Sequence, residues 1–350
     1  MPRETFCLRF DMPDPGDAAA LRAAIASGRI ARDGLRAVLL KTPGNGLTND
    51  HTRTLATREV LAALGPGPAP MMLASGGTEG IAVPHIILLG EMAGGGQPGR
   101  GLAIGLGHGP SITPADTAGP AMSRAVAAAV AAAMRTAGVT DAADVVIALV
   151  KAPLPSPFAF GGTEEAFAAL KGSARAAASL GAAAALGEIP WAQIGDGTTA
   201  ALHGHRTLVA AGTDVTAPEA LVIGQAPGWA GTLRAGATML VDMLDAPGVA
   251  ALLASLGLAA TPQLTAADAV RLRAVITKGE MPALLRGDRP AALDDSDIHP
   301  NRHFRAALGG MIAALTGDGR IFLSGGAEAQ TPPGGVLLAI IADTGQEAQE

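Results

Sequence analysis

The sequence predicts an α/β (α+β) fold built from three tandem homologous repeat units. Short apolar runs alternate with Ala/Leu-rich segments of 10–15 residues, which is typical of alternating strands and helices. Two spacings also recur along the chain. An arginine follows a lysine by 24 positions twice, at Lys151/Arg175 and at Lys278/Arg302. A serine follows an arginine by 22 positions twice, at Arg53/Ser75 and at Arg302/Ser324. Such internal repeats predict repeated structural units.

Each unit is predicted to open with a strand, continue with a helix and return as a strand that ends in a lysine. The opening strands are expected at 4–10, 101–107 and 237–244, and the first helices at 17–28, 123–138 and 247–257. Gly138 and Gly257 stand where helix C-caps are expected. Further apolar segments, at 80–89, 232–240 and 336–343, follow the serine positions. The unit boundaries are therefore placed at 1–97, 98–236 and 237–350.

Composition excludes several classes of protein. With 49% hydrophobic and 16% charged residues, the chain has enough apolar material for a large core. Aromatic residues make up only 3% and tyrosine is absent, which argues against a protein that stacks nucleic-acid bases on aromatic side chains. The net charge of −6 provides no basic surface for a polyanion. We therefore expect no nucleic-acid partner.

The single cysteine and the N-terminal segment bear on the compartment. Cys7 alone excludes an internal disulfide and fits a small core residue of the first strand. The N-terminal residues lack the basic and then apolar pattern of a signal peptide. The longest apolar helical run, 125–134, is far shorter than the roughly 20 residues that span a membrane. We expect a soluble, cytoplasmic protein.

The candidate catalytic residues stand at the ends of predicted strands. Lys41, Lys151 and Lys278 each end one strand, whereas Ser75 and Ser324 each end another and precede two glycines. Such ends are where a scaffold directs side chains into one pocket. A serine hydroxyl needs a base to become a nucleophile, and lysine is that base when its pKa falls from about 10.4 toward 7. Desolvation and neighbouring cations would cause that fall.

Four motifs resemble the ring-opening amidohydrolases, the cyanuric acid hydrolase/barbiturase family. They are SGGTEG (75–80), SGGAEAQ (324–330), GNGLTNDHTR (44–53) and LDDSDI (293–298), and the resemblance runs essentially end to end. It implies three alike units around a pseudo-threefold axis, with a central β-barrel-like core and helices outside. It also implies hydrolysis of one amide bond of a small, flat cyclic imide or ureide ring without a catalytic cofactor. A homo-oligomer, often a tetramer, is implied as well.

The resemblance assigns each unit a lysine, a serine and an arginine in a central pocket. The carried-over residues are Lys41, Lys151 and Lys278, Ser75 and Ser324, and Arg53, Arg175 and Arg302. The backbone N–H groups of Gly76 and Gly325 would stabilise an oxyanion. Guanidinium groups offer planar forks of donors that suit a ring with several carbonyls. Cyanuric acid is therefore the first expected substrate, and barbiturate the second.

At the third serine the chain differs from the family, and Ala226 is the predicted position. The resemblance makes the middle unit's serine the nucleophile, activated by the lysine that matches Lys151. Pro227 then removes a backbone N–H beside the pocket. A serine-to-alanine replacement made to trap substrate would explain Ala226 but not Pro227, so natural divergence is favoured. Turnover would then use Lys41–Ser75, Lys278–Ser324, or water activated by Lys151.

Two alternatives to a Ser/Lys hydrolase stay open. The first is a catalytically lost relative that binds such rings or acts as an oligomeric scaffold, for which Ala226 and Pro227 are the support. The second is a metal-dependent hydrolase built on His203 and His205, which form a His-x-His pair in a predicted exposed loop. The glycines of GLGHG (105–109) lack the spacing of a dinucleotide-binding loop.

Two further features concern structure rather than catalysis. The acidic run 294–297 is predicted to cap the helix that follows it. Some relatives hold a structural cation, Mg or Ca, largely on backbone carbonyls. The resemblance places that cation at Glu280, Ala327, Gln330 and Gly335.

Overall fold

A computed structural model describes residues 1–46, 50–195, 202–290 and 298–346. The order strand, helix, strand, helix, strand, strand recurs three times. The first unit contains β1 (Arg3–Asp11), α1 (Ala19–Ala26), β2 (Leu35–Thr42), α2 (Thr52–Leu64), β3 (Met71–Gly76) and β4 (His85–Ala93). The second contains β5 (Gly99–His108), α3 (Pro120–Ala137), β6 (Val145–Pro153), α4 (Pro157–Phe160), α5 (Glu164–Ala185), β7 (Thr207–Gly212) and β8 (Glu219–Ala230). The third contains β9 (Leu233–Leu240), α6 (Ala246–Ser255), α7 (Ala266–Ala269), β10 (Leu272–Gly279), α8 (Pro300–Thr316), β11 (Phe322–Gly325) and β12 (Val336–Asp343).

The strands of the three units pair in the same way. In each unit the lysine strand (β2, β6 or β10) lies parallel to the short strand that follows it and antiparallel to the closing strand. The closing strand also pairs antiparallel with the opening strand. The first two units share one eight-stranded sheet, joined where β1 pairs with β8, and the third unit forms a four-stranded sheet.

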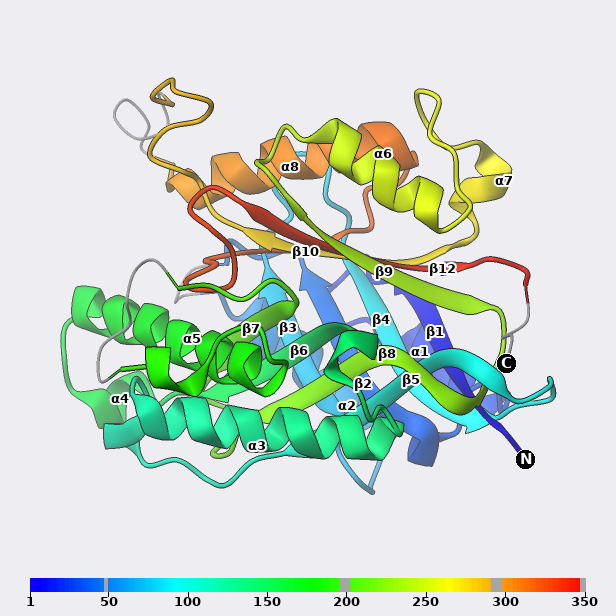
Figure 1. The fold of residues 1–350 in the computed structure, drawn as a ribbon, viewed down its shortest axis with the longest axis horizontal. Helices are drawn as coiled ribbons and strands as arrows, with labels where there is room; N and C mark the ends of the chain where they lie inside the picture. The colour runs from blue at the N-terminus through cyan, green and yellow to red at the C-terminus, as the bar shows by residue number, and fades with distance from the viewer. Residues whose placement is uncertain (47–49, 196–201, 291–297, 347–350) are drawn as a thin grey trace.

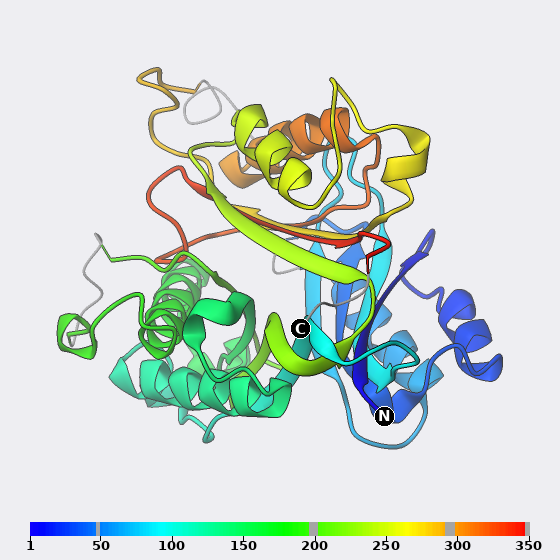
Figure 2. The ribbon, with the colours of Figure 1, turned by 45° about the vertical axis from the view of Figure 1, so that its right-hand side comes forward.

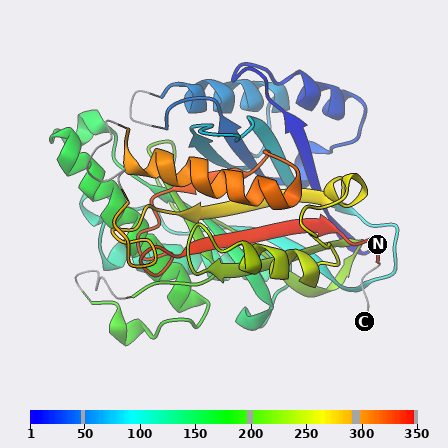
Figure 3. The same ribbon diagram turned by 90° about the horizontal axis from the view of Figure 1, so that it is seen from above.

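The units are arranged around a common middle. In Figures 1 and 2 the strands of the three units face one another, while α3 and α5 cover the outside of the second unit and α6 and α8 that of the third. Figure 3 shows α8 and α6 lying side by side over the strands of the third unit. The predicted fold is confirmed: three concatenated repeat units surround a pseudo-threefold axis, with a barrel-like core and helices outside.

The junction between the second and third units differs from the expected one. The predicted boundary at 236/237 falls inside β9, which pairs along its whole length with β12. Segment 232–240 therefore opens the third unit, and β8 closes the second. The predicted opening strand at 237–244 overlaps only the end of β9. Because β8 and β9 are both apolar and follow each other closely, the sequence did not show where one strand ends and the next begins.

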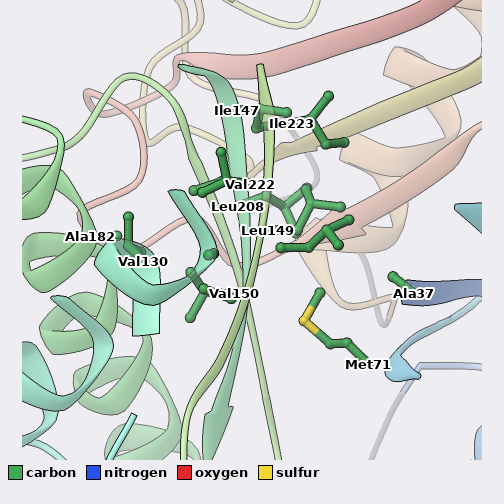
Figure 4. Packing of buried hydrophobic residues seen from close by; sticks show 14 of the residues in the cluster. Ala37, Met71, Val130, Ile147, Leu149, Val150, Ala182, Leu208, Val222 and Ile223 are labelled. Atoms are coloured by element: carbon green, nitrogen blue, oxygen red, sulfur yellow. The ribbon is translucent and has the colours of Figure 1, made fainter. Parts of the chain in front are cut away.

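The largest apolar cluster is built from all three units. Figure 4 shows its part between the first two units, where Ala37 and Met71 face Leu149 and Leu208. Cys7 is buried in the same cluster, and burial raises the pKa of its thiol to about 12. Within the ranges described, no helix combines the length and apolar character needed to cross a membrane.

The glycine-rich motif at 105–109 has a packing role. A Cβ on Gly105 or Gly107 would lie well under 3.0 Å from backbone atoms of α3. A Cβ on Gly109 would likewise lie well under 3.0 Å from the carbonyl oxygen of Ala125. These glycines let α3 lie directly on β5, so the motif reflects close helix–strand packing.

Replacing Gly107 with alanine should destabilise the protein by about 1–3 kcal/mol, because the added methyl would push α3 away from β5. Thermal unfolding measures the effect. Gly95→Ala is the matched control, since a Cβ there meets no atom within 4 Å. Equal melting temperatures for the two variants would contradict the packing role.

Candidate active site

The three lysine strands place equivalent residues opposite one another. Lys41 lies opposite Ser75 on β3, and Lys278 lies opposite Ser324 on β11. On β7 the residue opposite Lys151 is Ala210. We call each lysine, with the residue opposite it, a corner of the site, numbered by its unit. Each of the three lysine side chains is buried.

The first corner contacts the third unit. Lys41 Nζ lies 3.3 Å from Ser75 Oγ and donates to the carbonyl of Leu323 at 2.6 Å. The Ser75 hydroxyl donates to the same carbonyl at 2.8 Å. Leu323 immediately precedes Ser324. The first corner therefore holds the backbone that carries the serine of the third.

The other two lysines complete the convergence. Lys151 Nζ donates to the carbonyl of Met72 in the first unit at 3.3 Å. Lys278 Nζ lies 3.2 Å from Ser324 Oγ and 3.1 Å from the Gly325 carbonyl. The charges of Arg175 and Lys171, both from the second unit, act on Lys278. Lys41 and Lys151 thus reach the backbone of another unit, and the meeting of all three lysines at one centre stays a prediction.

The predicted position of the third serine, Ala226, is wrong. Ala226 lies on β8, opposite Gly101 of β5, and the neighbouring Pro227 is exposed opposite Arg100. The strand parallel to the Lys151 strand is β7, so the counterpart of Ser75 and Ser324 is Ala210. The stretch between α5 and β7 spans 186–206, which breaks the spacing seen in the other units. The second corner still has no serine.

Two arginine–glutamate pairs connect the units. The residue spacings in the sequence predicted Arg175 as a site residue, but not Arg305 or the two glutamates. Arg175 of α5 pairs with Glu328 of the third unit, with Nε 2.6 Å from Oε2 and a second, shorter contact. Arg305 of α8 pairs with Glu79 of the first unit in the same way, with Nε 2.8 Å from Oε2. Each glutamate stands four residues after a site serine, a regularity visible in the sequence.

The counterpart of Arg175 is thus Arg305 and not the predicted Arg302. Arg302 lies one turn earlier on α8, where its Nε is 4.0 Å from Glu79 Oε1 and its Nη2 donates to the Asn45 carbonyl. The 24-residue spacing misled because α5 and α8 begin at different distances from their lysine strands.

Arg53 of α2 has its Nε 3.8 Å from Asp50 Oδ2, and its charge acts on Lys171.

The glycines after the serines make room for these charged groups. A Cβ on Gly76 would collide with the Asp50 carboxylate. One on Gly325 would lie 3.1 Å from Arg305 Nη1, and one on Gly326 would lie 2.8 Å from Arg175 Nη2. Gly326 also has a positive φ of 77°. The Ser-Gly-Gly motif therefore places the serine where guanidinium and carboxylate groups approach the backbone.

Lysine is confined to this centre. The chain has four lysines among its 25 Lys and Arg residues, and the fourth, Lys171 on α5, was missed. Burial, and then the charge of Arg305, lowers the pKa of Lys41 to about 7. Burial, and then the charge of Arg175, lowers the pKa of Lys278 to about 7. Burial and the charges of Arg175 and Arg53 lower the pKa of Lys171 to about 8.

Three of the four residues predicted to hold a structural cation lie on loop 327–335, and the fourth, Glu280, contacts this loop. Glu280 Oε2 accepts the Ala327 N–H at 3.2 Å, and Gly335 N–H donates to the Pro332 carbonyl at 2.9 Å. The Gln330 side chain is already used, because its Oε1 accepts the Val209 N–H at 2.7 Å. One carboxylate and backbone carbonyls are hard oxygen donors of the kind that suit Mg²⁺ or Ca²⁺. Glu280 and carbonyls of loop 327–335 would hold the ion, which stays a prediction.

The remaining predictions are a metal-binding histidine pair and an acidic helix cap. His203 and His205 stack edge to face with centroids 5.0 Å apart. Across the described part of the chain, no three His, Cys, Asp or Glu side chains gather as a metal site requires. The acidic run 294–297, predicted as a helix cap, lies outside the described residues, and the N-cap of α8 is His299, whose Nδ1 accepts the Asn301 N–H at 3.2 Å.

Comparison with known proteins places this architecture in one family. A family model described as amidohydrolase ring-opening protein matches residues 7–343. The chain therefore belongs to the ring-opening amidohydrolase family.

Full-length relatives agree with this assignment. The chain is 40% identical to the cyanuric acid amidohydrolase of Methylobacterium sp. (strain 4-46), with 98% of each chain covered. It is 38% identical to the cyclic amide hydrolase of Azorhizobium caulinodans, covering 94% of this chain and 97% of that protein. The crystal structure of the A. caulinodans cyanuric acid hydrolase superimposes with a TM-score of 0.86 at 34% identity, covering 97% and 99% of the chains. A cyanuric acid hydrolase structure described as arising by structural concatenation gives 0.88 at 30% identity, covering 98% and 100%.

Lys278→Met should raise the melting temperature, and the gain should shrink as pH rises from 7 to 10. The folded-state pKa of about 7 lies below the unfolded value of 10.5, so the cost of burying this amine is largest at or below pH 7 and vanishes above 10.5. Scanning calorimetry between pH 6 and 10 measures the trend. Arg124→Met, on the exposed face of α3, is the control and should show no such trend. A gain independent of pH would contradict the buried, titrating amine.

Proposed function

We propose that this protein hydrolyses one amide bond of a small cyclic imide or ureide ring by Ser/Lys nucleophilic catalysis at the lysine centre. The observation that carries the proposal is the Lys278–Ser324 pair, in which a buried amine with a pKa of about 7 lies 3.2 Å from a serine hydroxyl. The names of the relatives support ring opening as the reaction. Cyanuric acid is the first ring to test and barbituric acid the second.

Ser324 suits the nucleophile better than Ser75. The Ser75 side chain is buried, and its hydroxyl proton is donated to the Leu323 carbonyl. Ser324 is partly exposed, and its contact with the Gly325 carbonyl is long, at 3.5 Å. A hydroxyl without a short competing acceptor can turn its proton to Lys278. In this proposal Lys41 and Ser75 position the strand that carries Ser324.

Lys278 would act first as base and then as acid. Near neutral pH a large share of its amine is unprotonated, so it can accept the Ser324 proton as Oγ bonds to the ring carbonyl carbon. When the C–N bond breaks, the same proton passes to the leaving ring nitrogen. Water then hydrolyses the serine ester, releasing the carboxylic acid and restoring the hydroxyl. The two steps together add one water molecule across one amide bond.

The charged groups around Ser324 suit the negative charge that develops on the attacked oxygen. Glu328 holds the Arg175 guanidinium against Gly326, and Glu79 holds the Arg305 guanidinium against Gly325. Fixed donors of this kind stabilise an oxyanion without rearranging during the reaction. The backbone N–H groups after Ser324 would add to them. No step requires a metal, and the cation predicted at Glu280 would be structural. A homo-oligomer, expected as a tetramer, remains part of the proposal.

Ser324→Ala should lower kcat for ring opening by at least about 10³-fold, since it removes the nucleophile. Ser75→Ala should lower it by no more than about 10²-fold, through a small displacement of β11. Steady-state kinetics on cyanuric acid, barbituric acid, hydantoin and succinimide measure both. Equal losses would contradict the division of roles, and normal turnover by both variants would contradict a serine nucleophile.

Turnover should persist in excess EDTA at a temperature where the chelated protein stays folded. The same assay separates the alternatives. Loss of turnover that Zn²⁺ restores would favour a metal-dependent hydrolase built on His203 and His205. Ring binding without turnover, measured by calorimetry, would favour a relative that has lost catalysis. Circular dichroism before and after chelation is the control for unfolding.

A further inference from the structure

The second corner has been rebuilt relative to the first and third. Where those units have Ser75-Gly76 and Ser324-Gly325, the register places Ala210 and Ala211. A hydroxyl and a hydrogen are thus replaced by two methyl groups, and both alanines are partly exposed. The second corner has become apolar where the others offer a hydroxyl.

The acidic residue of the second corner also has a different partner. Asp214 stands four residues after Ala210, as Glu79 and Glu328 stand after their serines. Its Oδ1 lies 2.8 Å from Lys151 Nζ, whereas the glutamates pair with arginines of a neighbouring unit. The Asp214 side chain is 49% exposed, so the carboxylate is accessible beside the lysine that it contacts.

A second carboxyl group adds to this difference. The residue opposite each lysine on the closing strand is His85 in the first unit, Glu219 in the second and Leu337 in the third. Burial, together with the charge of Asp214, raises the pKa of Glu219. The positive charge of Lys171 acts on both Lys151 and Lys278, so it does not distinguish the second corner from the third. Carboxylates also act on the other two lysines, Asp50 and Glu79 on Lys41 and Glu280 and Glu328 on Lys278. Within the described residues, however, Lys151 alone of the three forms an ion pair with a carboxylate, and its corner alone has two methyl groups in place of the serine and glycine.

We propose that the second corner selects rings that carry carbonyls on two edges and a C–H or N–H group, instead of a third carbonyl, on the remaining edge. The proposal rests on the function proposed above. A ring with three equivalent carbonyls would place one of them against the Asp214 carboxylate and the two methyl groups. Two oxygen acceptors facing each other repel, and the carbonyl would lose the hydrogen bonds it makes in water. An N–H edge would donate to Asp214, and a methylene edge would pack on Ala210 and Ala211.

The first and third corners suit the two carbonyl edges. Each has an amine beside a hydroxyl, at 3.3 Å for Lys41–Ser75 and 3.2 Å for Lys278–Ser324. Succinimide, hydantoin and dihydrouracil have the required pattern of two carbonyls flanking one N–H. Cyanuric acid, with three carbonyls, does not.

Relative kcat/KM values for hydantoin, succinimide and cyanuric acid test the proposal. Wild type should favour a two-carbonyl ring over cyanuric acid by at least about 10-fold. The triple variant Ala210→Ser/Ala211→Gly/Asp214→Glu recreates the pattern of the other units and should shift that ratio toward cyanuric acid by a similar factor. The ratio is taken within one enzyme, so partial unfolding does not affect it. Asp144→Asn, at an exposed ion pair with Arg100, is the matched control and should leave the ratio unchanged.

The outcomes separate this proposal from the function on which it rests. Turnover with a preference for cyanuric acid, unchanged in the triple variant, would overturn the role of the second corner and leave ring opening standing. If no ring is opened, dissociation constants for the same rings decide. Binding in the proposed order would support the corner, whereas absence of binding by every ring would overturn both.

Discussion

The burial of lysine amines where three repeat units meet is the constraint on which the rest of this structure depends. A buried ammonium without partners costs several kcal/mol, so each amine must find acceptors. Lys41 finds one in the Leu323 carbonyl and Lys151 one in the Met72 carbonyl, both in another unit. The lysines of the first and second units are therefore each satisfied by another unit, whereas Lys278 finds its partners within the third. The same burial lowers the pKa of Lys41 and Lys278, which is the property that the proposed proton transfer needs.

The arginine–glutamate pairs extend this dependence outward. Arg305–Glu79 joins the third unit to the first, and Arg175–Glu328 joins the second to the third. Burial alone would raise the pKa of each glutamate, but the hydrogen bond and charge of its arginine outweigh burial, so the pKa is lowered. These pairs place two guanidinium groups against the backbone after Ser324, and the Asp50 carboxylate lies against Gly76 after Ser75, which is why glycine follows each serine.

The repeat, the lysines and two serines could be predicted because they are local features that recur in one sequence. The β-α-β pattern and Lys41, Ser75, Lys278 and Ser324 all appear in the structure where the repeat put them. Predictions were wrong where residue spacing along the sequence was used in place of the pairing register of the strands. Ala226 was chosen because an insertion before β7 hid Ala210, and strand pairing alone reveals which residue faces Lys151. Arg305 and Lys171 were missed because helix phase and contacts between units decide which side chains reach the centre.

A threefold scaffold does not require a threefold reaction. In the proposed reaction only one amide bond is broken in a turnover, so one corner attacks while the others bind and align the ring. In this chain the corners differ in the way that such a division needs. Lys41 and Ser75 both donate to the carbonyl that precedes Ser324, so the first corner is tied to the third. The second corner has lost its hydroxyl and gained a carboxylate on Lys151. Because the units share a backbone plan, a few side-chain changes at equivalent positions suffice to give each corner a separate task.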